Sequence, residues 1–278
     1  MRDTYGYIDP ACPINWAHPL NRGLRAWWYI PRNPGWWGGE KLRDLCIRSP
    51  GTLNGGVLWR GGMGGACEFD GSNDYVSISN GPSLTGPCSV FAWVKPIGFG
   101  APGAKWIVAE GDGGSDAYLL EWNATAAKAS FAWAGAAYRL TGATDLVVGK
   151  WAHIGGSRGG STGAWNASVW YNGVSDASAS AIATNPNTAA GVSIGRLGSA
   201  SVGYANGLIR DVRLYDREVR AAEAAALYYQ SRTGNIDLLN WLPAARSSEQ
   251  AVAVGHPTMR RWGGVPGMVG AGRIGRSW

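Results

Sequence analysis

The chain has 278 residues, of which 43 are glycine and 16 are tryptophan, and its 25 basic and 19 acidic residues give a net charge of +6. Charged residues make up 16% of the chain, below the share of about 25% in average globular proteins, whereas the hydrophobic share of 45% allows a large buried core. No apolar run approaches the roughly 18 residues that cross a bilayer, and residues 1–7 lack the apolar centre of a secretion signal, so we expect neither membrane insertion nor secretion.

Short segments of strand length recur along the chain. They are rich in aromatic and β-branched residues and are separated by glycine, asparagine and aspartate, which favours strands joined by tight turns. The predicted strands are residues 23–30, 66–70, 75–78, 89–94, 106–109, 117–122, 129–133, 151–154, 167–171, 191–194 and 208–215. The pair Asn172-Gly173 is typical of a hairpin turn, because both central residues of that turn need positive φ. So many strands predict an all-β sandwich or jelly roll.

One segment, residues 220–230, has the composition of a helix. It is rich in alanine and contains neither glycine nor proline. Val219, Ala222, Ala226 and Tyr229 are spaced by three or four positions, so we expect them to share the face that packs on the sandwich.

The four cysteines are Cys12, Cys46, Cys67 and Cys88. An even count permits disulfides, but a chain with a large core and no secretion signal favours buried free thiols. The sequence holds no Cys-x-x-Cys, and its three histidines are far apart, which argues against a structural zinc site.

The two ends of the chain differ from its middle. Residues 1–22 contain three prolines and residues 233–278 show no periodicity, so we expect an N-terminal arm (1–22), a jelly-roll domain (23–232) and an extended basic C-terminal arm (233–278). Two alternatives stay open: the arms pack on a partner subunit, or they fold back on their own domain. The candidate assembly contacts in the arms are Trp16, Trp241, Met259, Arg260, Arg261, Trp262 and Met268. The arginines of the C-terminal arm are spread out, which favours a solvated tail, and no motif for specific nucleic-acid recognition is present.

Five stretches resemble the LamG, or laminin-G-3-like, branch of the concanavalin A-like jelly-roll family. They are GLRAWW at 23–28, Asp44-Leu45 with GTLNG at 51–55, FDGSNDYV at 69–76, GKWAHI at 149–154, and GLIRDVRLYDR at 207–217 before the helix. The resemblance implies a concanavalin A-like β-sandwich with one short C-terminal helix. It departs from the family where Arg220 replaces the usual serine or threonine three residues before Glu223, which leaves Asp216 as the candidate helix cap.

A second, shorter resemblance covers residues 14–24, INWAHPLNRGL, which look like the start of LamG-domain proteins encoded among phage structural genes. This resemblance implies a virion protein that assembles in the host cytoplasm. Its expected partners are other virion proteins or further copies of the chain itself.

The family resembled includes both binding proteins and glycoside hydrolases, so the residues must separate the two. A retaining glycosidase needs two carboxyl groups about 5–5.5 Å apart. Glu110 and Asp112 supply the first two acids of the pattern seen in enzymes of this fold, but the closing glutamate is missing, and Asp116 and Glu121 do not restore the spacing. We therefore expect no enzymatic activity, and we interpret His153 as a packed strand histidine.

Calcium is the one cofactor that the sequence leaves open. In some concanavalin-like folds a cation joins a loop to an aspartate of the last strand, and Asp211 with Asp70-Gly71 matches that arrangement. The alternative is that Asp211 pairs with Arg210 or Arg213, or accepts backbone amides.

Exposed tryptophans form sugar-binding platforms, because the indole stacks on the apolar face of a sugar. Trp36, Trp37 and Trp165 lie in segments that look like loops and are the candidate ligand-binding residues, although a tryptophan pair is equally typical of a subunit contact. The strand positions Trp93, Trp133 and Trp170 are expected in the core.

Together these patterns predict a non-enzymatic phage virion protein, either a capsid decoration or a fibre-associated protein, that displays a lectin-like jelly roll and binds a cell-surface glycan weakly. The alternatives are a carbohydrate-binding module without a structural role and, less favoured, a glycoside hydrolase of the same fold.

Overall fold

The computed structural model describes residues 14–29, 41–61, 65–100, 103–111, 114–134, 137–187, 191–198, 202–233 and 237–239, and the backbone of residues 7–8 and 241–242. Residues 1–243 form one compact unit and residues 244–278 a second, and all described residues belong to the first. The expected contacts Met259, Arg260, Arg261, Trp262 and Met268 therefore lie outside the described residues.

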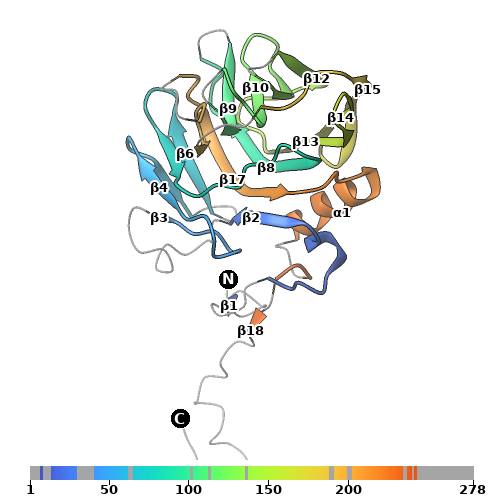
Figure 1. The fold of residues 1–278 in the computed structure, drawn as a ribbon. Helices are drawn as coiled ribbons and strands as arrows, with labels where there is room; N and C mark the ends of the chain where they lie inside the picture. Colours follow the sequence, from blue (N-terminus) through green and yellow to red (C-terminus); the bar gives the residue numbers. More distant parts are fainter. Residues whose placement is uncertain are drawn as a thin grey trace, which may run out of the picture. The chain divides into compact units, whose positions relative to one another are not determined.

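The first unit is a sandwich of two antiparallel sheets, as the sequence predicted (Figure 1). One sheet, called the β9 sheet below, consists of β3 (Lys41–Leu42), β4 (Gly51–Asn54), β7 (Tyr75–Ile78), β9 (Ala104–Glu110), β10 (Tyr118–Asn123), β11 (Lys128–Trp133), β12 (Tyr138–Asp145) and β16 (Val192–Ile194). Its strand order is β12-β11-β10-β9-β16-β7-β4-β3.

The other sheet, called the β8 sheet, consists of β2 (Leu24–Trp28), β5 (Leu58–Arg60), β6 (Ala66–Asp70), β8 (Cys88–Pro96), β13 (Ala152–Ser161), β14 (Ala164–Tyr171), β15 (Val174–Ile182) and β17 (Asn206–Tyr215). Its strand order is β15-β14-β13-β8-β17-β6-β5, and β2 pairs with β17 as well. The turn at Asn172 and Gly173, which both have positive φ, joins β14 to β15, so the predicted hairpin is confirmed.

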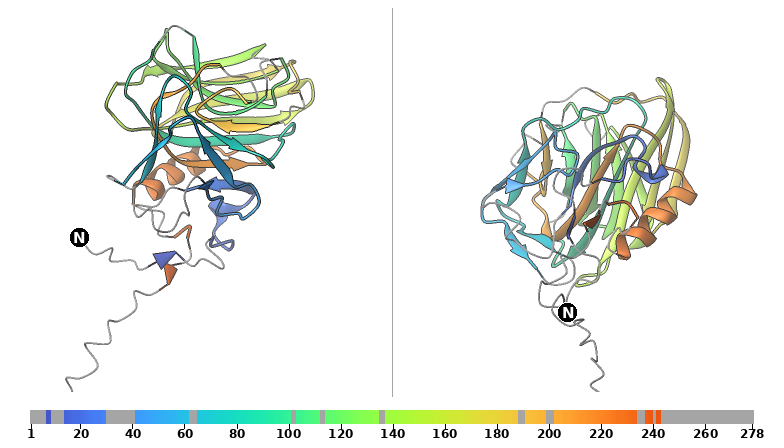
Figure 2. Two further views of the ribbon diagram at one scale, coloured as in Figure 1. Left: turned by 90° about the vertical axis from the view of Figure 1, so that its left-hand side faces the viewer. Right: turned by 90° about the horizontal axis from the view of Figure 1, so that it is seen from below.

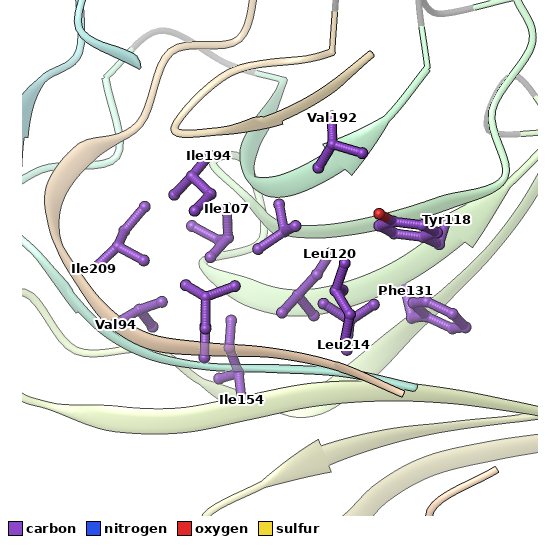
Figure 3. Close-up of a cluster of buried hydrophobic side chains, with 14 of the residues drawn as sticks. Val94, Ile107, Tyr118, Leu120, Phe131, Ile154, Val192, Ile194, Ile209 and Leu214 are labelled. Carbon is purple, nitrogen blue, oxygen red and sulfur yellow. The ribbon is translucent and has the colours of Figure 1, made fainter. Parts of the chain in front are cut away.

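The main core lies between the two sheets (Figure 3). Strand alternation places every second side chain inward, and the register aligns Val108, Leu120 and Phe131 across three neighbouring strands of the β9 sheet. Facing residues of the β8 sheet, among them Ile154 and Leu214, complete the core.

Strand β13 is longer than the sequence predicted, and glycine is the reason. Its segment Gly155-Gly156 faces two phenylalanines, and a Cβ on Gly156 would lie 2.2 Å from Cγ of Phe131, while a Cβ on Gly155 would lie 2.3 Å from Cδ1 of Phe91. The glycines make room for these rings. Because glycine is not typical of strands, the sequence did not predict that β13 continues through this segment.

Helix α1 (Ala221–Arg232) covers the outer face of the β8 sheet, on the side away from the β9 sheet (Figure 2). The predicted packing face is confirmed for Val219, which is buried, and for Ala226, which packs against the same cluster, but it is wrong for Ala222 and Tyr229, which are exposed. The buried positions within α1 itself are Ala224, Leu227 and Ser231. In a segment this rich in alanine, spacing alone does not identify the buried face.

The start of α1 is also different from the expectation. The Glu223 carboxylate accepts a hydrogen bond from the backbone N–H of Arg220 at 3.2 Å. Asp216 does not cap the helix in the described contacts, and it accepts a hydrogen bond from Nε of Arg25 at 2.6 Å.

The parts of the expected arms that the structure describes pack on the domain. The short helix η1 (Pro19–Asn21) and the flanking Ile14 belong, with Leu238 and Leu239, to a second buried cluster under α1. Residues 14–22 and 237–239 thus follow the alternative in which the arms fold back on their own domain, because aliphatic side chains of these segments complete this cluster. Beyond them, β1 (Tyr7–Ile8) pairs antiparallel with β18 (Trp241–Leu242), so the two ends of the unit meet.

Cys46, Cys67 and Cys88 are free thiols, and Cys67 and Cys88 are buried. Burial raises the pKa of Cys67 to about 12, so this thiol stays protonated. Cys12 lies outside the described residues. None of the helices described is long and apolar enough to span a membrane.

Candidate functional site

The predicted sugar platform at Trp165 is wrong. This residue lies in β14, not in a loop, and its side chain is only 3% exposed. Its Nε1 donates a hydrogen bond to Oδ1 of Asn185 at 2.9 Å, and its ring packs beside the guanidinium of Arg158 at 5.2 Å. A sugar cannot stack on a ring held in this way, and Trp36 and Trp37 lie outside the described residues.

The tryptophans assigned to the core are buried, as predicted. Trp133 belongs to the main core, Trp170 belongs to the cluster under α1, and Trp93 packs against Tyr228 of the helix. Of the candidate assembly contacts, Trp16 is 52% exposed, and only the backbone of Trp241 is described.

The structure does not bring the proposed calcium ligands together. Asp70 pairs with Asn206 at the start of β17, whereas Asp211 lies five residues farther along that strand, a distance of about 16 Å. Asp211 instead follows the alternative, because its carboxylate accepts hydrogen bonds from Arg213 at 2.9 and 3.0 Å and from Nε1 of Trp27 at 2.5 Å. Among the described residues, no group of three or more histidine, cysteine or acidic side chains is arranged to hold a metal ion.

The environment of Asp211 is that of a structural ion pair. Burial alone favours the neutral acid, but the charge of Arg213 and the two donors outweigh it, so the pKa of Asp211 is lowered. Its backbone has φ of 52°, in the left-handed region, at the point where the register of β17 against β8 shifts. This irregularity points the carboxylate at Arg213 beneath the helix.

Glu110, the first acid of the hydrolase pattern, faces the interior. It lies opposite Tyr118 and Val192, whose side chains belong to the main core. Its carboxylate accepts a hydrogen bond from the backbone N–H of Leu84 at 3.3 Å, and burial raises its pKa to about 7 although Arg158 opposes the shift. Asp112 lies outside the described residues.

Glu121 lies on the opposite face of the same sheet. Its neighbours Leu120 and Trp122 point into the main core, so the alternation of β10 directs Glu121 outward. Nε of Arg139 lies 2.7 Å from Oε1 of this carboxylate, and burial raises the pKa of Glu121 to about 7 against the opposing charge of Arg139. Sequence reasoning set Glu121 aside because the only test was its spacing from Glu110.

Around Glu121 the outer face of the β9 sheet is aromatic and polar. Glu121 lies opposite Trp106 on β9 and opposite Ser130 on β11, and the hydroxyl of Ser130 lies 3.0 Å from that of Thr141 on β12. The guanidinium of Arg139 lies 6.0 Å from the Trp106 ring centroid. An indole, an ion pair and two hydroxyls thus share one row of this face, and Trp106, Glu121 and Ser130 are all buried there.

The same row continues at the other end of the sheet with more accessible residues. Tyr75 on β7 lies opposite Asn54 on β4, and both are half-buried. The guanidinium of Arg196 stacks on the Tyr75 ring at 3.4 Å, and the ring of Tyr204 lies 6.5 Å from that of Tyr75. The Asn54 amide donates a hydrogen bond to the Ser77 hydroxyl at 3.1 Å.

The connection after β16 separates these two ends. Leu197 packs with Trp106, Ala109, Leu119 and Ala132 in a small apolar cluster outside the main core. The glycine at position 203 is required there, because a Cβ would lie 2.4 Å from the Trp106 ring and the residue has a φ of +65°, in the left-handed region that favours glycine.

A model of the concanavalin A-like lectin/glucanases superfamily matches residues 70–225, more than half of the chain. The chain belongs to this family. Among curated proteins, none matches the sequence.

Solved structures show the same fold. Domain 4 of AbnA, a GH43 extracellular arabinanase from Geobacillus stearothermophilus solved with arabinotriose, is 18% identical, with a TM-score of 0.54 over 74% of this chain and 98% of that one. The receptor-binding domain of botulinum neurotoxin D is 11% identical, with a TM-score of 0.57 over 76% of this chain and 54% of that one.

A Trypanosoma rangeli sialidase, solved with 2,3-difluorosialic acid, is 15% identical, with a TM-score of 0.55 over 76% of this chain. The match covers only 33% of the sialidase chain, so this chain spans about a third of that protein. At such identities the similarities show the fold alone.

Proposed function

We propose that this chain is a non-enzymatic, lectin-like protein that binds a glycan on the outer face of the β9 sheet. The observation that carries the proposal is the accessible end of this row, where Tyr75 and Asn54 are half-buried, whereas Trp106 at the other end is only 7% exposed and packs beside Leu197. Aromatic rings that stack on sugar faces, together with a few fixed hydrogen-bonding groups, are what a sugar site requires.

The positions of Glu110 and Glu121, whose pKa values burial raises to about 7, favour binding over hydrolysis. A glycosidase places its acid and its second carboxylate on either side of one glycosidic bond. Glu110 points into the core and Glu121 points out of the sheet, so these two cannot flank one bond.

The solved relatives add support at the level of the fold. Two of them were solved with sugars or sugar analogues, namely the arabinanase domain with arabinotriose and the sialidase with a sialic acid derivative. The proposal transfers only the class of ligand, a glycan, and leaves its identity to experiment.

For the biological setting we propose a phage virion, with the chain as a capsid decoration or a fibre-associated protein. The proposal is supported by the resemblance of residues 14–24 to phage-encoded LamG proteins and by the meeting of β1 and β18, which directs both ends of the unit to one place. Residues 244–278, which form a separate unit, then serve as the anchor. Mass spectrometry of purified particles tests this setting directly, and a chain absent from particles would contradict it.

A glycan array probed with the full chain tests the binding proposal. Tyr75→Ala should abolish binding to the selected sugar, whereas Tyr229→Ala, which removes a tyrosine that is 64% exposed on α1, should leave binding unchanged. A chain that binds no glycan, or a Tyr75→Ala variant that binds normally, would contradict the proposal. Trp36→Ala and Trp37→Ala in the same assay test whether the candidate tryptophans outside the described residues contribute.

A further inference from the structure

Two loops lie side by side at one end of the sandwich. One follows β8 and the other precedes β13, and these strands are neighbours in the β8 sheet (Figure 1). Ala152 lies opposite Val94, and beyond this pair the backbone N–H of Gly149 donates a hydrogen bond to the carbonyl of Pro96 at 2.8 Å. The hydrogen bond fixes the two loops together.

Both loops expose aliphatic side chains. Ile97 is 46% exposed, and Val147 and Val148 are 45% and 50% exposed. The N–H of Lys150 donates to the carbonyl of Val147 at 3.0 Å, so the two valines occupy a closed turn. Exposed aliphatic residues that gather in adjacent loops, instead of being scattered singly, indicate a contact surface.

Cationic side chains surround these residues. Lys95 is half-buried beside Ile97, and Lys150 is exposed beside the valines. Trp151 follows, and its ring lies 4.6 Å from the guanidinium of Arg210 on β17. We call the surface formed by Lys95, Ile97, Val147, Val148, Lys150 and Trp151 the basic corner.

The two loop segments of the basic corner carry no negative charge in their sequence. Residues 95–100 and 146–151 contain no aspartate or glutamate. The preceding Asp145 has its own partner, because its carboxylate lies 3.4 Å from Nζ of Lys128. The corner therefore presents positive charge around an apolar centre.

We propose that the basic corner docks on an anionic lipid surface. Aliphatic side chains at a loop tip can enter the boundary of a bilayer, lysines attract anionic headgroups, and tryptophan favours the interface between the two. A protein partner fits less well, because the centres of protein interfaces are enriched in aromatic residues, methionine and arginine rather than in valine and isoleucine at turns. The proposal goes beyond glycan binding and does not depend on it.

Sedimentation of the full chain with lipid vesicles tests the proposal. The chain should bind vesicles that contain phosphatidylglycerol and should bind vesicles of phosphatidylcholine alone much more weakly. Lys150→Glu should weaken binding to the anionic vesicles about fivefold or more, since each lysine near an anionic surface contributes ~1 kcal/mol. The double change of Val147→Asp and Val148→Asp should weaken it roughly tenfold or more, because charged side chains cannot enter the bilayer boundary.

Two matched changes serve as controls. Val174→Asp alters a valine that is 68% exposed at the start of β15, and Lys41→Glu alters an exposed lysine on β3. Both should bind vesicles like the unchanged chain. No binding to anionic vesicles, equal binding to neutral ones, or an equal loss in the control variants would overturn the proposal. A chain that fails to bind lipid but retains its glycan would leave the proposed function intact.

Discussion

Glu121 and Arg139 form an ion pair in which the carboxylate is completely buried while 33% of the arginine side chain stays exposed. Nε of Arg139 lies 2.7 Å from Oε1 of Glu121 on the outer face of the β9 sheet. Its burial distinguishes it from an ordinary surface ion pair, which contributes little to stability.

Removing the arginine should therefore destabilise the domain. Arg139→Ala leaves a buried carboxyl group without its partner, and we expect the free energy of unfolding to fall by about 2 kcal/mol. Denaturation with urea at neutral pH measures the change. Adding Glu121→Gln to the same chain should restore part of the loss, since the buried group is then neutral, and a double variant no more stable than Arg139→Ala alone would argue against this explanation.

Stability should also rise as the solution becomes mildly acidic. Burial raises the pKa of both Glu110 and Glu121 from 4.5 to about 7. Between pH 4.5 and 7 the folded chain therefore keeps two protons that the unfolded chain releases. This contribution is fully present below pH 4.5 and is lost as the pH rises through 7. Thermal unfolding across this range should show a higher midpoint at the acidic end, and the double variant Glu110→Gln and Glu121→Gln should flatten the profile.

His153 should produce the opposite effect at lower pH. Burial between Phe91, Trp93 and Tyr228 lowers the pKa of His153 from 6.5 to about 3, so the unfolded chain takes up a proton that the folded chain refuses. Its contribution to stability is lost as the pH falls from 6.5 toward 3, and with the two glutamates it places the maximum of stability near pH 4.5. His153→Phe keeps the stacking and should move the acid midpoint of unfolding to lower pH, which acid titration followed by tryptophan fluorescence measures. An unchanged midpoint would be inconsistent with this role.

Residues 244–278 should be dispensable for folding and required for anchoring. They form a separate unit, and the two sheets bury their core without them. A chain ending at residue 243 should keep the thermal unfolding midpoint of the full chain but should no longer be incorporated into particles. Normal incorporation of the shortened chain would refute the anchoring role.

The strands were largely predictable because their inward residues are aromatic or β-branched, as at Val108, Leu120 and Phe131. Strand β12 was missed because its segment, Tyr138–Asp145, contains threonine, glycine and arginine and has few buried side chains. Strand β4 was taken for a loop because its glycine and asparagine are typical of turns.

The candidate site was harder to predict because it depends on register across strands. Glu121 and Arg139 are 18 residues apart, and only the pairing of β10, β11 and β12 places them together. A polar residue between two core residues, as Glu121 is between Leu120 and Trp122, was the available signal. The prediction of Trp165 as a sugar-binding residue was wrong because its inward direction follows from the register of β14, which its neighbours in sequence do not reveal.

A titration of the full chain with the array-selected sugar, followed by backbone amide chemical shifts, tests whether a glycan occupies the outer face of the β9 sheet. The shifts should change at Tyr75 and Asn54 and stay constant in α1. Changes confined to α1 or to the β8 sheet would contradict this prediction.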